Sequence, residues 1–164
     1  MTATNDILRI GLQESSLIFE SFDAQMAWEL GSSLKALCEQ RGLAVTIEIR
    51  IARETIFFYA MPGTAPENAD WARRKRNTVE LMNRSSYGVG LSLQESGDSL
   101  EAMMGLPLRD YCVHGGGFPI QTRSSGYVGV VTISGLPERE DHEIVVEILA
   151  GMCGVSIASI KFDT

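Results

Sequence analysis

Four stretches of the chain repeat apolar residues at three- and four-residue steps, the spacing of one helix face. They lie at residues 7–14, 23–41, 68–82 and 137–155. Asn5 and Asp6 are suited to cap the first helix, Gly42 to end the second, and Pro137 to occupy the first turn of the last. A further helix is expected over residues 85–95, followed by a polar break at residues 96–99.

Residues 45–52 change period, because isoleucine or valine alternates with Thr46, Glu48 and Arg50. A period of two predicts a strand with one face in the core and the other facing water or a partner. Residues 55–61 are the expected hairpin partner, and residues 118–122 and 127–134 form a second hairpin. Residues 111–114 are a further extended candidate. This order predicts an α+β fold, an antiparallel sheet packed with helices, rather than a doubly wound parallel sheet.

Composition narrows the class of protein. A hydrophobic fraction of 45% and a charged fraction of 21% over 164 residues suit a single domain spanning residues 1–164. The net charge of −7 argues against nucleic acid as a partner. The longest apolar runs are too short to cross a membrane. Three widely spaced cysteines and the lack of a basic-then-apolar leader lead us to expect a cytoplasmic location.

The most unusual local feature is His114-Gly-Gly-Gly-Phe-Pro-Ile120. Glycines reach positive φ and let a ligand or another chain approach the backbone closely. One interpretation is a ligand-facing loop in which His114 is a polar group or an iron ligand. The alternative is a bulge or tight bend between strands, with His114 merely hydrogen-bonded.

A basic cluster stands in this acidic chain at Trp71-Ala-Arg-Arg-Lys-Arg76. Lys75 shares a helix face with Trp71, so its ammonium is expected to point inward. The cluster is suited to hold a carboxylate or phosphate. A solvated or intersubunit charged face is the commoner explanation.

Two further groups of residues could bear chemistry. Asp141 and His142 follow Ser134-Gly-Leu-Pro at a strand-to-helix corner, where they are candidate metal ligands or simply part of an acidic helix start. Cys112 and His114 are two residues apart and would share one side of a strand, but no second pair completes a four-ligand set. No C-x-x-C-H motif is present, which argues against covalent c-type haem.

Together, Asp70-Trp71 with Arg74-Lys75-x-Asn77-Thr78-Val79, His114-Gly-Gly-x-Phe-Pro-Ile120, and Ser134-Gly-Leu-Pro with Asp141-His142 resemble one family. The chain resembles the GlcG/HbpS-like group, and within it the cytoplasmic branch of haem-degrading-domain proteins. The resemblance implies a profilin-like or PAS-like α+β fold with an antiparallel sheet of about five strands. It also implies assembly into dimers and larger rings, and makes haem or iron a candidate cofactor.

The leading hypothesis is a homo-oligomeric protein that binds haem or a related small anionic ligand. Its pocket is expected between the His114–Pro119 loop, the Trp71–Lys75 helix and the 134–142 corner. The expected ligand-binding residues are Trp71, Arg74, Lys75, His114, Gly115, Gly116, Gly117, Phe118, Pro119, Ser134 and Gly135. In this hypothesis Arg74 and Lys75 attract a propionate, and the amides of residues 115–117 donate hydrogen bonds. The alternatives are an enzyme that degrades haem or processes a small acid, and an oligomer with a structural or adaptor role and no ligand.

Overall fold

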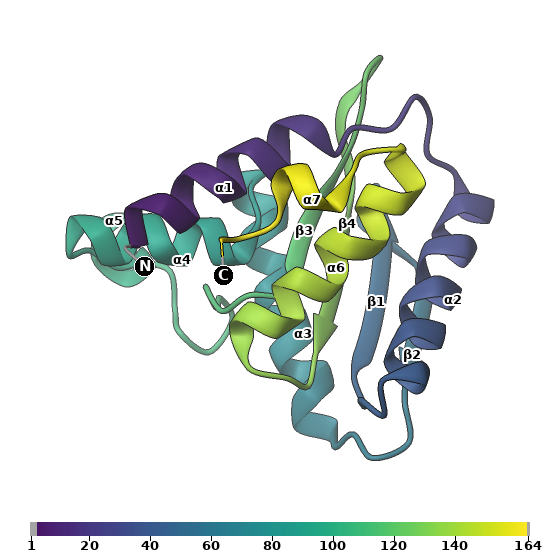
Figure 1. Ribbon diagram of the computed structural model, residues 1–164. Helices are drawn as coiled ribbons and strands as arrows, with labels where there is room; N and C mark the ends of the chain where they lie inside the picture. Colours follow the sequence, from purple (N-terminus) through teal and green to yellow (C-terminus); the bar gives the residue numbers. More distant parts are fainter. Residues whose placement is uncertain (1–2, 164) are drawn as a thin grey trace.

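The computed structural model describes residues 3–163, which form an antiparallel sheet surrounded by helices (Figure 1). The helices are α1 (Ala3–Ser16), α2 (Ala24–Gln40), α3 (Pro66–Met82), α4 (Ser86–Ser96), α5 (Leu100–Met104), α6 (Glu138–Cys153) and α7 (Ile157–Ile160). The strands are β1 (Thr46–Ile51), β2 (Glu54–Ala60), β3 (Gly117–Thr122) and β4 (Gly126–Ser134).

The strands lie in the order β2-β1-β4-β3, and each neighbouring pair is antiparallel. Ala52 and Arg53 have φ values of 49° and 67° and form the tight turn between β1 and β2. The two hairpins meet where β1 pairs with β4, in a register that sets Thr46 opposite Ser134. The sheet is therefore built from two local hairpins joined by one long-range pairing.

One face of the sheet is covered by α2 and α6, as Figure 1 shows. The alternation along β1 turns Ile47 and Ile49 toward these helices, and both are fully buried. The same core takes apolar residues from α2, α6 and the other strands, Leu30, Leu34, Phe57, Phe118, Val131, Ile133, Val145 and Leu149. Burial of this face supplies the main driving force for the fold.

The opposite face is covered by α3, which packs across β4, β3 and β1. Here the polar side chains of β1 meet charged partners: Glu48 accepts from Arg76 at 2.7 Å, and Arg50 pairs with Glu80 at 3.1 Å. The polar face of β1 therefore lies against this chain's own helix rather than against water or another protein.

The structure confirms the α+β class and most of the expected elements, and corrects some details. The first helix begins at Ala3, so Asn5 and Asp6 lie inside it and do not cap it. The described residues form four strands rather than about five, because residues 111–114 are irregular. The short helices α5 and α7 were not expected, since one helical turn is too short to show a period. Within residues 3–163, no helix is long and apolar enough to cross a membrane.

Candidate functional site

The three sequence motifs meet at a buried ion pair beside the carboxyl end of β4. Lys75 Nζ on α3 lies 2.8 Å from Asp141 Oδ2 on α6, and their side chains are only 4% and 1% exposed. Lys75 also donates to the carbonyl oxygen of Ile133 at 3.2 Å. The inward direction expected for Lys75 is confirmed.

The corner between β4 and α6 holds the carboxylate of Asp141 in place. The backbone amides of Gly135 and Leu136 donate to its two oxygens at 3.4 and 3.2 Å. Burial raises the pKa of Asp141 to about 6, although Lys75 and these amides act in the opposite direction. The carboxylate is thus costly to bury and depends on its partners to stay ionised.

Gly116 leaves the space that this ion pair occupies. Its φ is 126°, a conformation that favours glycine, and a Cβ there would clash with the carbonyl oxygen of Ile133 and lie 3.0 Å from Lys75 Nζ. A Cβ on Gly115 would clash with the carbonyl oxygen of Glu138. The glycine run therefore permits close approach of its backbone to α6 and to the ion pair.

The expectation that residues 115–117 offer their amides to a ligand is wrong for Gly117. Its N–H donates to Ser86 Oγ at 3.0 Å, inside the protein. Phe118 and Pro119 are buried in β3, where Phe118 belongs to the core beneath α6. This part of the motif supports the site from behind and does not line a pocket.

Trp71, Arg74 and His114 form a stack beside the ion pair, in which His114 is exposed and the other two are partly buried. The rings of Trp71 and His114 lie 5.2 Å apart and within 13° of parallel. The Arg74 guanidinium lies 3.7 Å from the Trp71 ring, a cation–π distance. No group within residues 3–163 hydrogen-bonds the ring nitrogens of His114. Cys112 does not share a strand face with it; instead the His114 backbone N–H donates to Cys112 Sγ at 3.3 Å.

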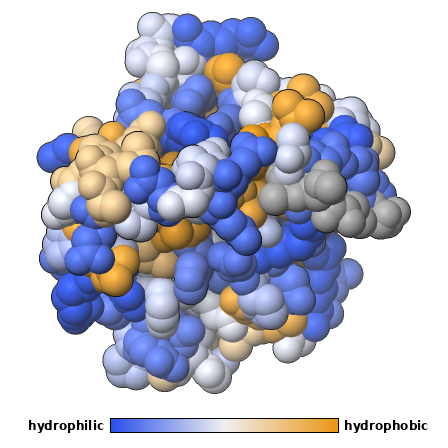
Figure 2. All heavy atoms as spheres, turned by 90° about the vertical axis from the view of Figure 1, so that its left-hand side faces the viewer, coloured by the Kyte–Doolittle hydropathy of each residue, from blue (hydrophilic) through white to orange (hydrophobic). Residues whose placement is uncertain are grey.

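This stack borders an apolar pocket of about 410 Å³. Besides the three stacked residues, the pocket is lined mainly by apolar side chains from α4, α5 and the segment after α5, namely Leu93, Leu100, Leu108, Tyr111, Cys112 and Val113. Figure 2 turns this end of the molecule toward the viewer and shows hydrophobic atoms exposed among hydrophilic ones. Apart from Cys112, sequence reasoning missed these lining residues, because no spacing relates α4 to a loop that folds back on it.

A second, polar pocket of about 190 Å³ shares Trp71 and His114 with the first. Its other lining residues are Asn68, Lys75, Ser134, Gly135, Leu136 and Glu138. The expected ligand-binding residues thus divide into two groups. Trp71, Arg74, Lys75, His114, Ser134 and Gly135 line one pocket or both, whereas residues 115–119 line neither.

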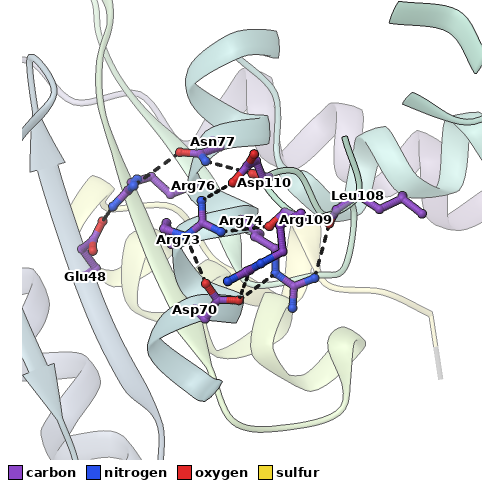
Figure 3. A network of polar contacts seen from close by, with 9 residues as sticks. All are labelled: Glu48, Asp70, Arg73, Arg74, Arg76, Asn77, Leu108, Arg109 and Asp110. Atoms are coloured by element: carbon purple, nitrogen blue, oxygen red, sulfur yellow. Dashed lines mark hydrogen bonds and ion pairs between the residues drawn. The ribbon is translucent and has the colours of Figure 1, made fainter. Parts of the chain in front are cut away.

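The arginines of the basic cluster on α3 pair with acidic side chains of the same protein, as Figure 3 shows. Asp70 pairs with Arg73 at 3.1 Å, with Arg74 at 3.3 Å and with Arg109 at 2.8 Å. Hydrogen bonds from Arg109 and Arg73 lower the pKa of Asp70. Arg73 also reaches Asp110 at 2.9 Å. The network therefore fastens the segment that carries Leu108 onto α3, and so shapes the mouth of the apolar pocket.

Asp141 and His142 engage different partners. Asp141 is held by Lys75, whereas the His142 ring lies 2.8 Å from Gln13 Oε1 of α1, among Tyr87, Phe118 and Phe162. Burial lowers the pKa of His142 to about 3, with a smaller contribution from nearby Arg139. Among residues 3–163, no group of three or more histidine, cysteine or acidic side chains could hold a metal ion.

Solved structures of other proteins share this fold. The crystal structure of the Ybr137w protein superposes with a TM-score of 0.81 at 27% identity, over 90% of this chain and 87% of that one. HbpS gives 0.63 at 18% identity over 80% and 89% of the two chains. A PduOC:haem complex gives 0.67 at 20% identity over 81% and 94%. The last two similarities show that the fold is shared.

Sequence comparison identifies the family. The model for the haem degrading protein HbpS-like family matches residues 22–150, and the chain belongs to this family. A UPF0303 protein of Azotobacter vinelandii is 56% identical over 163 residues, covering 99% of this chain and 98% of that protein. A UPF0303 protein of Rhizobium meliloti is 44% identical over the full length of both. The resemblance drawn from the three motifs is confirmed.

Proposed function

We propose that this protein is a cytoplasmic, homo-oligomeric binding protein for a flat, largely apolar ligand that carries an acidic group, with haem as the leading candidate. The observation that carries the proposal is the stack of Trp71, Arg74 and His114 at the border of the apolar pocket. It sets an imidazole and a guanidinium beside a hydrophobic cavity. Such a cavity with a few polar groups is the usual form of a small-molecule site.

The residues present fit haem chemically. The apolar lining suits the faces of a porphyrin, and a volume of about 410 Å³ lies within the range common for ligand sites. Arg74 is suited to bind a propionate, because it shares the single carboxylate of Asp70 with Arg73 and Arg109, which leaves positive charge for a ligand carboxylate. His114 is exposed, so its ring is free to bind iron. Bound haem would supply redox-active iron, while the chain's own residues bind and orient it.

The comparisons support haem as the probe to use first. A protein of the same fold, PduOC, has been solved as a haem complex, and the matching family model is described as haem degrading. These descriptions concern those proteins. The free thiols of Cys38, Cys112 and Cys153 are consistent with a reducing compartment.

A haemin titration, monitored by visible absorption and by native mass spectrometry, tests the proposal. The wild-type protein is expected to form a stoichiometric complex with a sharpened Soret band, and His114→Ala to shift or weaken it. Leu108→Glu at the pocket mouth should weaken binding, whereas Leu8→Glu, equally exposed but on α1, should not; the two leucines are 65% and 68% exposed. Equal, loose binding by all four proteins would refute the haem proposal. Conversion to a defined bilin with a reductant would make the protein an enzyme.

Self-association is proposed through the open edge of the sheet. Strand β2 is an edge strand: Ile56 and Phe58 are exposed on its face away from α2, and Trp28 of α2 packs on Phe57 on the other face. Trp28 is 62% exposed and Phe58 50%. Large apolar side chains gathered on an unpaired edge are typical of an interface.

A further inference from the structure

The polar pocket has its own set of hydrogen-bonding groups, separate from the apolar pocket. Asn68 and Lys75 reach it from α3, Ser134 from the end of β4, and Glu138 from the start of α6. Its volume of about 190 Å³ is under half that of the apolar pocket. It is therefore sized for a small molecule or for one substituent of a larger ligand.

Lys75 brings an unfilled donor to this pocket. A lysine ammonium has three N–H groups. Two of them have partners within residues 3–163, Asp141 Oδ2 and the Ile133 carbonyl oxygen. The side chain is buried yet lines the pocket, so the third N–H is left for an acceptor there. A buried donor without a partner is costly, which favours an oxygen-bearing ligand at this point.

Ser134 is a buried residue, only 3% exposed, whose hydroxyl has no hydrogen-bond partner within residues 3–163 and reaches the pocket. Alternation along β4 turns Ile133 toward the core under α6, so Ser134 faces the side on which α3 carries Lys75. Serine and lysine therefore both offer hydrogen bonds from buried positions to one small space.

The surrounding charge favours an anion. Lys75 lines the pocket, whereas its counter-charge Asp141 lies behind it and does not. The pocket also borders the N-terminal end of α6, a helix of 16 residues whose dipole is positive at that end. Asn68 Oδ1 already accepts from the Ala65 N–H, which leaves its amide group as a donor. Opposing this, the exposed Glu138 brings one negative charge to the rim.

We propose that the polar pocket binds a carboxylate, held by the Lys75 ammonium and the Ser134 hydroxyl. The carboxylate belongs either to a separate small acid or to a substituent of the ligand in the neighbouring apolar pocket. The proposal does not depend on haem, since the polar pocket has its own donors.

Tryptophan fluorescence tests this site, with sodium acetate as the probe and acetamide as its neutral counterpart of the same shape. The chain has two tryptophans, and Trp28→Phe on the surface leaves Trp71, at the pocket, as the sole reporter. In that background, acetate should give a saturable change at constant ionic strength, and acetamide a binding constant at least tenfold weaker. Ser134→Ala should weaken acetate binding severalfold, whereas Ser125→Ala in the distant β3–β4 turn should not change it.

The outcomes separate this proposal from the previous one. A response to acetate without saturation, equal binding of acetamide, or no effect of Ser134→Ala would each overturn the carboxylate site, whatever happens with haemin. If acetate saturates and haemin displaces it, the proposal holds and the carboxylate comes from the larger ligand. If acetate and haemin bind together, the proposal holds for a separate small acid.

Discussion

Replacing Lys75 by methionine should destabilise the protein strongly, because it leaves the carboxylate of Asp141 buried without its counter-charge. Breaking a buried ion pair in this way typically costs about 3–5 kcal/mol. The amides of Gly135 and Leu136 still solvate Asp141 in the variant, which favours the lower end, about 3 kcal/mol. Small domains have about 5–15 kcal/mol of stability, so the variant should still fold.

The cost of Lys75→Met should grow with pH. In the wild-type fold the pKa of Asp141 is about 6, above its ordinary 3.8, so the folded state holds the proton more tightly than the unfolded state does. The stability that Asp141 contributes therefore falls as pH rises from about 4 to 6. Without Lys75 the folded pKa rises further, and the loss continues above pH 6. In the variant, each pH unit above 6 then lowers the free energy of unfolding by as much as about 1.4 kcal/mol, which gives roughly 2.7 kcal/mol between pH 6 and 8.

Urea unfolding at pH 6 and pH 8 measures this effect. Lys75→Met combined with Asp141→Asn should lose the pH dependence, because the titrating group is gone. Lys35→Met is the matched control, since Lys35 pairs with Glu39 on the surface of α2, where the loss of an ion pair changes the stability little. A cost of Lys75→Met that is the same at both pH values, or the same as in the double variant, would refute the reasoning.

Three further predictions concern the backbone, acid stability and assembly. Gly116→Ala should lower the thermal unfolding midpoint strongly, because residue 116 has a φ of 126° and a Cβ there would clash with Ile133. The control Gly151→Ala, in open space on α6, should raise the midpoint slightly, because alanine has the higher helix propensity. Equal midpoints for the two variants would contradict the prediction. The pKa of His142 is about 3, below the ordinary 6.5, so this group contributes stability above pH 6.5 that is lost as pH falls toward 3. His142→Gln should therefore weaken the decline in the free energy of unfolding at acidic pH, measured by urea unfolding. An unchanged decline would count against this prediction. Phe58→Glu should reduce the assembly mass in light scattering; an unchanged mass would place the interface away from β2.

The local pattern of apolar and polar residues was sufficient to predict most of the helices and strands. The strict alternation from Val45 to Ile51 predicted β1, because a period of two suits a strand whose faces differ, and the structure has a core on one face and charged residues on the other. Asp23 and Gly42 marked the limits of α2, where the Asp23 side chain accepts from the Met26 N–H and Gly42 has φ 67°. The expectation of about five strands was one too many. Residues 111–114 have side chains typical of a strand, but α3 holds them in an irregular conformation, where the Cys112 N–H donates to the Arg74 carbonyl.

The sequence by itself determined that Lys75 faces inward and that the glycine run permits close approach of the backbone, and its three motifs indicated the family by resemblance. The first two follow from local spacing and from residue type. Only the tertiary structure decided that Lys75 meets Asp141, that Arg109 pairs with Asp70, and that Leu93 and Leu108 enclose a pocket. These contacts join segments 15 to 66 residues apart, and such long-range proximity is set by how the helices pack on the sheet, which no local periodicity encodes.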